Sequence, residues 1–192
     1  NHIAHEGLAR RVIGGFWGNA PKMVKLAQEE KLEGYNFPQG VLEHLMRATA
    51  AGAPGVITTT GLFTFVDPRV EGGKINERTT EDLVDVILIN QKKYLLYKKI
   101  PFSIAVIRGT SIDKNGNLTM EDEVATFSML SIAQAAKVNG GMVIAQVQNV
   151  KEHEAAVPGR VKVPGSFIDY VVVDPNQGMT FLTKYDKSMI CL

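Results

Sequence analysis

The feature that most constrains this chain is an alternation, over its first 60 residues, of short β-rich runs with segments of helical period. Residues 10–17 contain β-branched and aromatic side chains, residues 33–37 contain two aromatic side chains, and glycine, asparagine or proline ends each run. Apolar residues then recur at helical spacing in residues 21–30 and 39–49, and a third β-branched run follows at 56–59. Strands and helices that alternate through short connections are typical of parallel sheets built by right-handed crossovers. The pattern predicts an α/β fold.

The rest of the chain predicts additions to this sheet, some of them antiparallel. Residues 61–80 are rich in Gly, Asp, Pro, Asn and Thr, which indicates an irregular excursion of a length that is often functional. Asn90-Gln91 joins two β-rich runs into an expected hairpin. We therefore expect an open, mostly parallel mixed sheet with helices on both faces. Its remaining elements are the hairpin strands 83–89 and 92–97, strands 104–107, 142–147 and 167–173, a turn at 113–117 and a helix at 124–137.

Bulk properties exclude several classes of protein. A length of 192 residues is enough for one domain, and a formal net charge of +1 indicates no nucleic acid partner. The longest apolar runs are far shorter than the ~20 residues of a membrane span, so we expect no membrane association. Cys191 is the only cysteine, which excludes an intramolecular disulfide and fits a reducing compartment such as the cytoplasm.

Polar residues follow three successive predicted strands, and they are the candidate site. Gly18-Asn19 follows the first strand, Gln39-Gly40 the second, and Thr59-Thr60-Gly61 the third. Because the carboxyl ends of parallel strands meet at one edge of a sheet, we expect these groups to converge there. The amide of Gln39 could donate a hydrogen bond to a carbonyl oxygen at that edge.

Each of these motifs also has a purely structural interpretation. Glycines permit tight packing of a strand against a helix, Gln39 could be a helix cap, and threonine is simply a good strand residue. The four histidines form no pattern of metal ligands, so no metal site is expected. Glu33 and Glu71 lie beside glycines, but neither has a neighbour that marks it as a nucleophile, so we read both as solvated carboxylates.

Several strings of the sequence, taken in order, resemble the α-like half of family I coenzyme A transferases. The resemblance is greatest to the acetate/propionate type, in which both halves lie on one chain, and it extends to about residue 185. The strings are NHIAHEGL (1–8), RVIGGFWGNAP (11–21), YNFPQG (35–40), AGAPGVIT (51–58), FVDPRVEGGK (65–74), IRGTSIDKNGNLT (107–119) and VPGSFIDYVVV (163–173).

This resemblance implies transfer of coenzyme A between an acyl-CoA and a short-chain carboxylate such as acetate, propionate or butyrate. In the family, a glutamate of the β-like half attacks the thioester, and a glutamyl-CoA thioester forms. That glutamate has no counterpart in this chain, so the chain alone is expected to be inactive. Coenzyme A is then a substrate, no permanently bound cofactor is expected, and the β-like half is a required partner. The resemblance also suggests a homo-oligomer.

Residue by residue, the resemblance assigns roles to the strand ends. Gln39 matches a glutamine that binds the acyl carbonyl oxygen, and Gly40 fixes its turn. Thr59, Thr60 and Gly61 match a loop that lines the acyl pocket, and Gly18 with Asn19 matches the loop beside it. Residues 1–174 correspond to the α-like domain without its N-terminal part, and residues 175–192 to the start of a linker toward the β-like half.

An alternative from another class stays open at this point. The same fold could serve as a non-catalytic α/β module for binding or assembly, because a fold alone does not determine a function.

Overall fold

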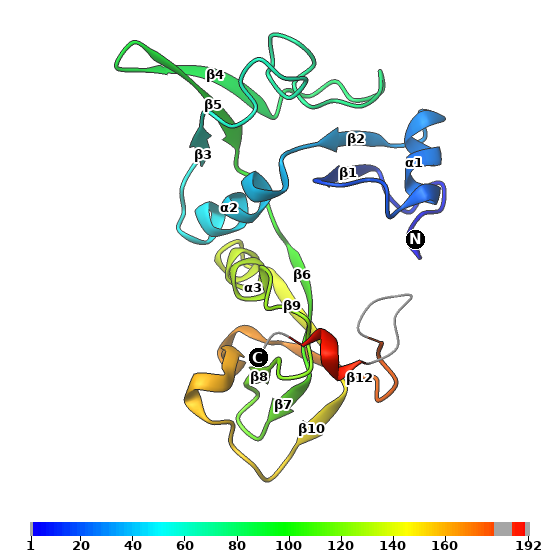
Figure 1. The fold of residues 1–192 in the computed structure, drawn as a ribbon, viewed down its shortest axis with the longest axis vertical. Coiled ribbons are helices and arrows are strands. Elements are labelled where there is room, and N and C mark those ends of the chain that lie inside the picture. Colours follow the sequence, from blue (N-terminus) through cyan, green and yellow to red (C-terminus); the bar gives the residue numbers. More distant parts are fainter. Residues whose placement is uncertain (1, 179–185, 191–192) are drawn as a thin grey trace. The chain divides into compact units, whose positions relative to one another are not determined.

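The computed structural model describes residues 2–178 and 186–190. The chain divides into two compact units, and each is considered by itself. Unit 1 comprises residues 1–48 and 53–100, and unit 2 comprises residues 49–52 and 101–192. Figure 1 labels most of their helices and strands.

Unit 1 begins with the predicted strand and helix alternation. Strands β1 and β2 are parallel, with Gly14 opposite Asn36 at their carboxyl ends. The elements of this unit are β1 (Arg11–Gly14), α1 (Pro21–Gln28), β2 (Glu33–Asn36), α2 (Gln39–Ala50), β3 (Gly55–Thr58), β4 (Val84–Ile89) and β5 (Lys92–Lys98).

The two faces of the β1–β2 pair belong to two separate hydrophobic clusters. Val12 packs with Met23 and Ala27 of α1, whereas its neighbour Ile13 packs with the cluster around Tyr35 on the other side. Side chains alternate between the faces of a strand, so one short strand can serve both clusters. The larger cluster consists of Tyr35, Phe37, Val41, Leu45, Val66, Leu83, Val84, Leu95 and Tyr97.

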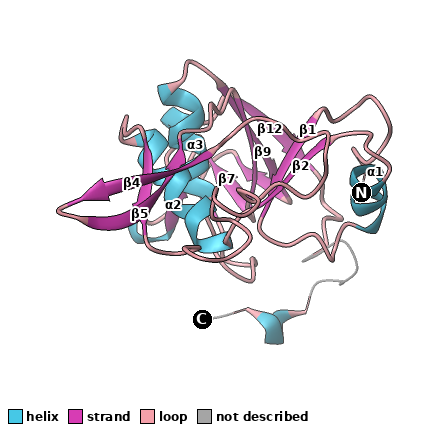
Figure 2. Ribbon diagram, turned by 90° about the horizontal axis from the view of Figure 1, so that it is seen from above, coloured by secondary structure: helices cyan, strands magenta, loops and turns pink. Residues whose placement is uncertain are grey.

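A second sheet of unit 1 is antiparallel, in the order β3-β5-β4. Its long hairpin, visible in Figure 2, turns at Asn90 and Gln91, whose φ angles are 49° and 65°. The hairpin prediction is confirmed at this turn. The prediction that residues 56–59 join the parallel sheet is wrong, because β3 pairs antiparallel with β5, Val56 lying opposite Tyr97. A β-branched run suits either orientation, so its partner strand is not encoded locally.

The excursion between β3 and β4 is ordered by one buried carboxylate. Asp67 accepts hydrogen bonds from the backbone N–H groups of Phe63 (2.9 Å) and Arg69 (3.0 Å) and from Nε of Arg69 (2.8 Å). The Arg69 guanidinium holds the pKa of Asp67 well below its usual range. Farther along, Oγ1 of Thr79 accepts a hydrogen bond from the Gly34 N–H at 2.7 Å, which fastens the excursion to the edge of β2.

Unit 2 contains a parallel sheet in the order β12-β9-β6 and a smaller mixed sheet in the order β10-β7-β8-β11. Helix α3 packs on the parallel sheet through Ala133 and Ala136, which lie in one cluster with Ala105, Val143 and Ala145. The elements of unit 2 are β6 (Ile104–Arg108), β7 (Ser111–Asp113), β8 (Leu118–Thr119), α3 (Met129–Val138), β9 (Met142–Val147), β10 (Asn149–Lys151), β11 (Val161–Val163) and β12 (Tyr170–Val173), with 3-10 turns at Pro158–Arg160, Gly165–Phe167 and Lys187–Met189.

The helix predicted at 124–137 begins later, at Met129. Residues before it form turns, and Phe127 has a φ of 40°, which a helix does not allow. Glu123 faces Arg108 instead of starting a helix. The strand predicted at 167–173 is likewise shorter, because a 3-10 turn occupies Gly165–Phe167.

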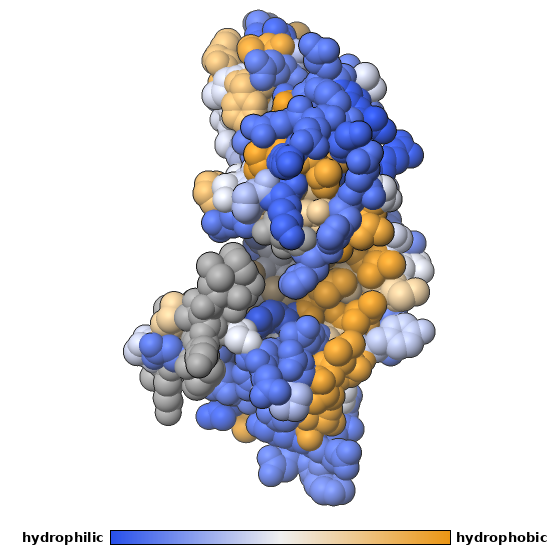
Figure 3. Space-filling model, turned by 90° about the vertical axis from the view of Figure 1, so that its right-hand side faces the viewer, coloured by the Kyte–Doolittle hydropathy of each residue, from blue (hydrophilic) through white to orange (hydrophobic). Residues whose placement is uncertain are grey.

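The second face of the unit 2 parallel sheet carries exposed apolar side chains. Figure 3 shows apolar surface in a band on this unit. Ile104 is 53% exposed and Val106 69% exposed, whereas their strand neighbours Ala105 and Ile107 are buried. Among the described residues, no helix long and apolar enough to cross a bilayer occurs.

The α/β class with a mixed arrangement of strands is confirmed.

Candidate active site

The carboxyl ends of β1 and β2 place the start of helix α2. The N–H of Phe37 donates to the carbonyl oxygen of Gly14 at 2.9 Å, which continues the parallel pairing by one residue. Pro38 then ends the strand because it has no N–H to continue the ladder. The carbonyl oxygen of Pro38 accepts hydrogen bonds from the N–H groups of Val41 (2.9 Å) and Leu42 (3.2 Å), so the helix begins there.

The first two backbone N–H groups of α2, those of Gln39 and Gly40, have no acceptor among the described residues. Unpaired N–H groups at a helix N-terminus carry the positive end of the helix dipole. The exposed side chain of Gln39 adds a carboxamide at the same point. Together these donors can bind a carbonyl oxygen or an oxyanion.

Gly40 contributes open space beside these donors. Its φ is not positive, and it lies in a helix, so other residues could adopt its backbone conformation. A Cβ atom placed on Gly40 would meet no described atom within 4 Å apart from its chain neighbours and the backbone of its own helix. The side that Gly40 presents is therefore accessible to a bound molecule.

The loop after β1 packs closely against the start of α2. A Cβ atom on Gly15 would lie 2.9 Å from both Cα and Cβ of Gln39, so only glycine fits there. Nε1 of Trp17 donates to the carbonyl oxygen of Tyr35 at 3.1 Å, which ties the loop to β2. Gly18 and Asn19 follow in this loop and are both exposed. The loop thus fixes the position of the Gln39 backbone.

Asn36, at the end of β2, has a buried side-chain oxygen without a hydrogen-bond partner among the described residues. A buried acceptor without a donor is uncommon in folded proteins and calls for an explanation. Its backbone N–H is satisfied by the carbonyl oxygen of Gly73 at 2.8 Å. The side-chain oxygen of Asn36 is therefore a buried, unsatisfied acceptor at this strand end.

Thr59, Thr60 and Gly61 lie at the end of β3, in the other sheet of unit 1. The hydroxyl of Tyr97 donates to the carbonyl oxygen of Thr60 at 2.8 Å. Burial raises the pKa of Tyr97 to about 12, so this hydroxyl keeps its proton near neutral pH. Gly61 has a φ of 97°, and a Cβ atom there would lie 2.5 Å from the Tyr97 hydroxyl. The loop is thus held in place by Tyr97.

The predicted convergence of three strand ends is therefore only partly correct. The ends of β1 and β2 meet, whereas β3 lies in a different sheet. The threonine loop is linked to Gln39 indirectly, because the ring of Tyr97 contacts that of Phe37 edge-on with 5.4 Å between centroids. No hydrogen bond joins Thr59 or Thr60 to Gln39 in the described part of the chain.

Glu33 is already engaged in an ion pair within unit 1. A guanidinium nitrogen of Arg11 lies 2.5 Å from Oε2 of Glu33, and this hydrogen bond lowers the pKa of Glu33. A paired carboxylate at the start of β2, away from the strand's carboxyl end, is not placed as a nucleophile. Glu71 is exposed in the excursion.

The equivalent strand ends in unit 2 are closed by side chains. Nε and a terminal nitrogen of Arg108 each donate to the Glu123 carboxylate at 3.0 Å. Nε2 of Gln177 donates to the carbonyl oxygen of Gly109 at 2.8 Å and to Glu123 at 3.1 Å. The Gln177 amide also accepts a hydrogen bond from Gln146 at 3.1 Å. These side chains are therefore hydrogen-bonded to one another and to the backbone within unit 2.

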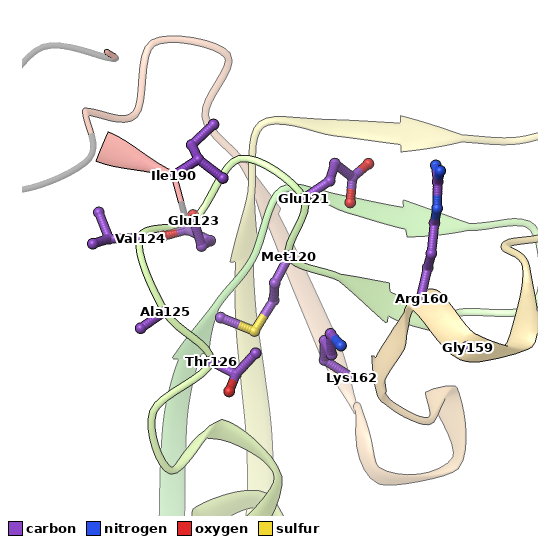
Figure 4. A pocket seen from close by; sticks show the side chains of 10 residues that line it. All are labelled: Met120, Glu121, Glu123, Val124, Ala125, Thr126, Gly159, Arg160, Lys162 and Ile190. Atoms are coloured by element: carbon purple, nitrogen blue, oxygen red, sulfur yellow. The ribbon is translucent and has the colours of Figure 1, made fainter. Parts of the chain in front are cut away.

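A pocket of about 650 Å³ lies beside this closed network (Figure 4). It contains none of the residues predicted from the sequence. Its carboxylate Glu123 is held by Arg108, and Glu121 pairs with Lys151 at 3.2 Å. The lining residues are Met120, Glu121, Glu123, Val124, Ala125, Thr126, Gly159, Arg160, Lys162 and Ile190. In the described residues, no group of His, Cys, Asp and Glu is arranged to hold a metal ion.

Sequence reasoning missed two residues of the candidate site, Phe16 and Asn36. Phe16 is 67% exposed although it follows a half-buried strand. The signal for Phe16 was its place in the loop directly after the predicted strand, where Gly15 on its N-terminal side has no side chain to cover its ring. Nothing in the sequence marks the Asn36 side chain as unpaired, because that depends on the fold of distant residues.

Comparison with known proteins gives a consistent result. The family model described as "Coenzyme A transferase" matches residues 2–174. Acetate CoA-transferase YdiF of Escherichia coli (strain K12) is 47% identical over 175 residues, which cover 91% of this chain and 33% of that protein. Caffeate CoA-transferase of Acetobacterium woodii is 45% identical over 179 residues, 93% of this chain and 34% of that protein.

A solved structure agrees with these matches. The acyl-CoA transferase YdiF of E. coli O157:H7, crystallised as a thioester complex with CoA, has a TM-score of 0.93 and 44% identity to this chain. The likeness covers 97% of this chain and 39% of that one. The chain thus spans about a third of the length of the relatives it matches.

Proposed function

The chain belongs to the coenzyme A transferase family, and from this premise we propose that the protein containing it transfers coenzyme A between an acyl-CoA and a carboxylate. The observation that carries the proposal is the start of helix α2, where the Gln39 carboxamide and two unpaired N–H groups lie together at the ends of β1 and β2. Such donors stabilise the oxyanion that forms when a thioester carbonyl is attacked.

The nucleophile in this proposal is a glutamate of the polypeptide outside this chain. Its carboxylate attacks the thioester carbonyl and the C–S bond breaks. CoA leaves as a thiolate, and an acyl-glutamyl anhydride remains on the enzyme. The thiolate then attacks the glutamyl carbonyl, which releases the first carboxylate and leaves a glutamyl-CoA thioester. An incoming carboxylate reverses these two steps and departs as the new acyl-CoA.

In this scheme the residues of unit 1 position the acyl group. Gln39 contacts the carbonyl oxygen, and Gly40 leaves room for it. Gly18 and Asn19 lie in the loop beside Gln39, and Thr59, Thr60 and Gly61 contribute a second loop held by Tyr97. Residues 1–174 act as an α-like domain, and residues 175–192 lead toward the β-like half. We expect a multimer in the cytoplasm.

We propose acetate, propionate and butyrate as the class of carboxylate. A relative named for acetate and one named for caffeate are almost equally similar to this chain. Overall identity therefore does not select the acid, and the side chains around the acyl group must do so.

The test is a rate measurement on the full-length protein that contains this chain. Gln39→Ala should lower kcat for CoA transfer from propionyl-CoA to acetate by roughly 10²-fold, as removal of one oxyanion donor does elsewhere. Stability should not change, because Gln39 is exposed. Gln28→Ala, which alters a second exposed glutamine near the end of α1, is the matched control and should leave the rate unchanged. A normal rate in Gln39→Ala would remove Gln39 from the site.

A further inference from the structure

The side chain of Phe16 lies at the candidate site without a covering layer. It follows the end of β1, and 67% of its surface is exposed. Most exposed apolar residues need no explanation, but an aromatic ring beside unpaired hydrogen-bond donors is a combination that binding sites use.

Two nearby glycines, Gly15 and Gly18, limit where this ring lies. A Cβ atom on Gly18 would come within 2.8 Å of Cζ of Phe16 and 3.2 Å of Cε1, so the ring rests against Gly18. The preceding residue, Gly15, contacts the backbone of Gln39 so closely that a Cβ atom would lie 2.9 Å from its Cα. The ring and the carboxamide therefore flank the same short stretch of chain.

We propose that Phe16 determines which carboxylate the enzyme prefers, by forming the apolar wall against which the alkyl chain of the acyl group packs. This assignment rests on the function proposed above. An acyl thioester has a polar carbonyl and an apolar tail. With the carbonyl oxygen at the start of α2, the tail is within reach of the ring, and burying each methylene against it favours longer acids.

Two other phenylalanines of the described residues, Phe63 and Phe127, are about as exposed as Phe16. Phe63 is 78% exposed, but the Arg69 guanidinium lies over its ring at 5.0 Å. Phe127 is 69% exposed and lies in unit 2, next to the start of α3. Phe127 therefore matches Phe16 in type and exposure without being part of the site.

The experiment compares acceptors in the full-length protein with propionyl-CoA as the common donor. We expect Phe16→Ala to lower the ratio of kcat/KM for butyrate to that for acetate by about fourfold. Burying one methylene fully raises kcat/KM by about fourfold. The ring contacts only one side of the acyl chain, so each of the two extra methylenes of butyrate contributes roughly half of that free energy, and together they again give about fourfold. Phe16→Leu should keep most of the ratio, and Phe127→Ala should keep all of it.

A second variant addresses the position of the ring instead of its presence. Gly18→Ala adds a methyl group where the ring now rests, and the backbone of Gly18 has no positive φ that would forbid it. The ring must move, so the same ratio should fall while the amount of folded protein is unchanged.

The outcomes separate the two proposals. Transfer activity with an unchanged or increased butyrate to acetate ratio in Phe16→Ala would overturn the role of Phe16 and leave the enzyme function standing. An unchanged ratio with a lower Tm would assign the ring a packing role only. A wild-type protein that transfers no CoA would overturn the proposed function, and the role of Phe16 with it.

Discussion

The two units place the carboxyl ends of parallel strands in opposite states. In unit 1, β1 and β2 end at an exposed carboxamide, an exposed ring and two backbone N–H groups that have no acceptor among the described residues. In unit 2, β6 and β9 end in a network in which Arg108, Glu123 and Gln177 satisfy one another. The same sheet geometry is thus open in one unit and closed in the other.

This difference shows that polar groups at a strand end can serve either stability or ligand binding, depending on whether they already have hydrogen-bond partners. Groups that already have partners gain little from a ligand, and removing one of them leaves its partner buried and unpaired. Groups without partners contribute little to folding and can bind a ligand. We therefore expect mutations in the closed network to reduce stability and mutations at the open ends to reduce catalysis.

The largest expected effect is at the Arg108 and Glu123 pair. Glu123 has a side chain only 7% exposed, so Arg108→Ala would leave a buried charge without its partner. We expect the free energy of unfolding to fall by about 3 kcal/mol, measured by urea denaturation. Lys151→Ala breaks a more exposed pair with Glu121 and should cost less than about 1 kcal/mol. Equal effects of the two variants would contradict a closed network.

A smaller effect on the free energy of unfolding is expected at Gln177, which is the glutamine near the strand ends of unit 2, as Gln39 is in unit 1. Gln177 is 6% exposed and donates to Gly109 and Glu123. Gln177→Ala should therefore lower the free energy of unfolding by about 1–2 kcal/mol. Gln39→Ala should change it by less than about 0.5 kcal/mol, as is usual for an exposed residue. Urea denaturation curves of both variants measure these free energies. A larger loss of stability in Gln39→Ala than in Gln177→Ala would contradict the difference between the two units.

Much of this could be predicted from the sequence, and the limits have physical causes. The order β1-α1-β2-α2 follows from side-chain periodicity, with Pro21 at the start of α1 and Pro38 just before α2, and the β4–β5 hairpin from Asn90-Gln91. These are local signals. The partner of β3 was assigned wrongly, because strand pairing is decided by residues about 40 positions away in β5.

The site was predicted less completely than the fold. The position of Gln39 and Gly40 at the start of α2 was predicted, because a helix start is a local feature of the sequence. The asymmetry between the units was not predictable, since Arg108 meets Glu123 and Gln177 only after turns and strands of unknown direction are placed. The same holds for Gly15, whose contact with Gln39 joins residues 24 positions apart in the sequence.

Acidification should affect the two buried aspartates that order turns in the two units. Burial by itself would raise the pKa of Asp113, but hydrogen bonds from Ala156, Asn117 and Asn115 outweigh it and lower the pKa to about 2. The pKa of Asp67 is also depressed, by Arg69. Both carboxylates therefore contribute stability above the unfolded value of about 3.9, and this stability is lost as pH falls through the folded value.

The acid effect is measured by urea midpoints between pH 5 and pH 2.5. The wild-type midpoint should fall across this range. The stability that Asp113 contributes is lost only in part, because Asp113 is still mostly ionised at pH 2.5. Asp113→Asn should start lower at pH 5 and fall less on acidification. A parallel fall in wild type and Asp113→Asn would contradict the assigned role of this carboxylate.

A small effect on stability, with the opposite sign, is expected at Gly40. A Cβ atom there meets nothing within 4 Å, and alanine is a better helix former than glycine. Gly40→Ala should raise the free energy of unfolding by about 0.5 kcal/mol and lower kcat/KM for CoA transfer, because the methyl group occupies the open space. A more stable variant with normal kinetics would show that the space is not used.

The claim that one set of strand ends is open and the other closed is tested most directly by amide hydrogen exchange in the full-length protein. Without ligand, the N–H groups of Gln39 and Gly40 should exchange fast, and saturating acyl-CoA should slow them. The N–H of Gly109, which donates to Gln146 at 2.9 Å, should exchange slowly in both states. Slow exchange at Gln39 and Gly40 before acyl-CoA is added, or no change after it, would contradict the account.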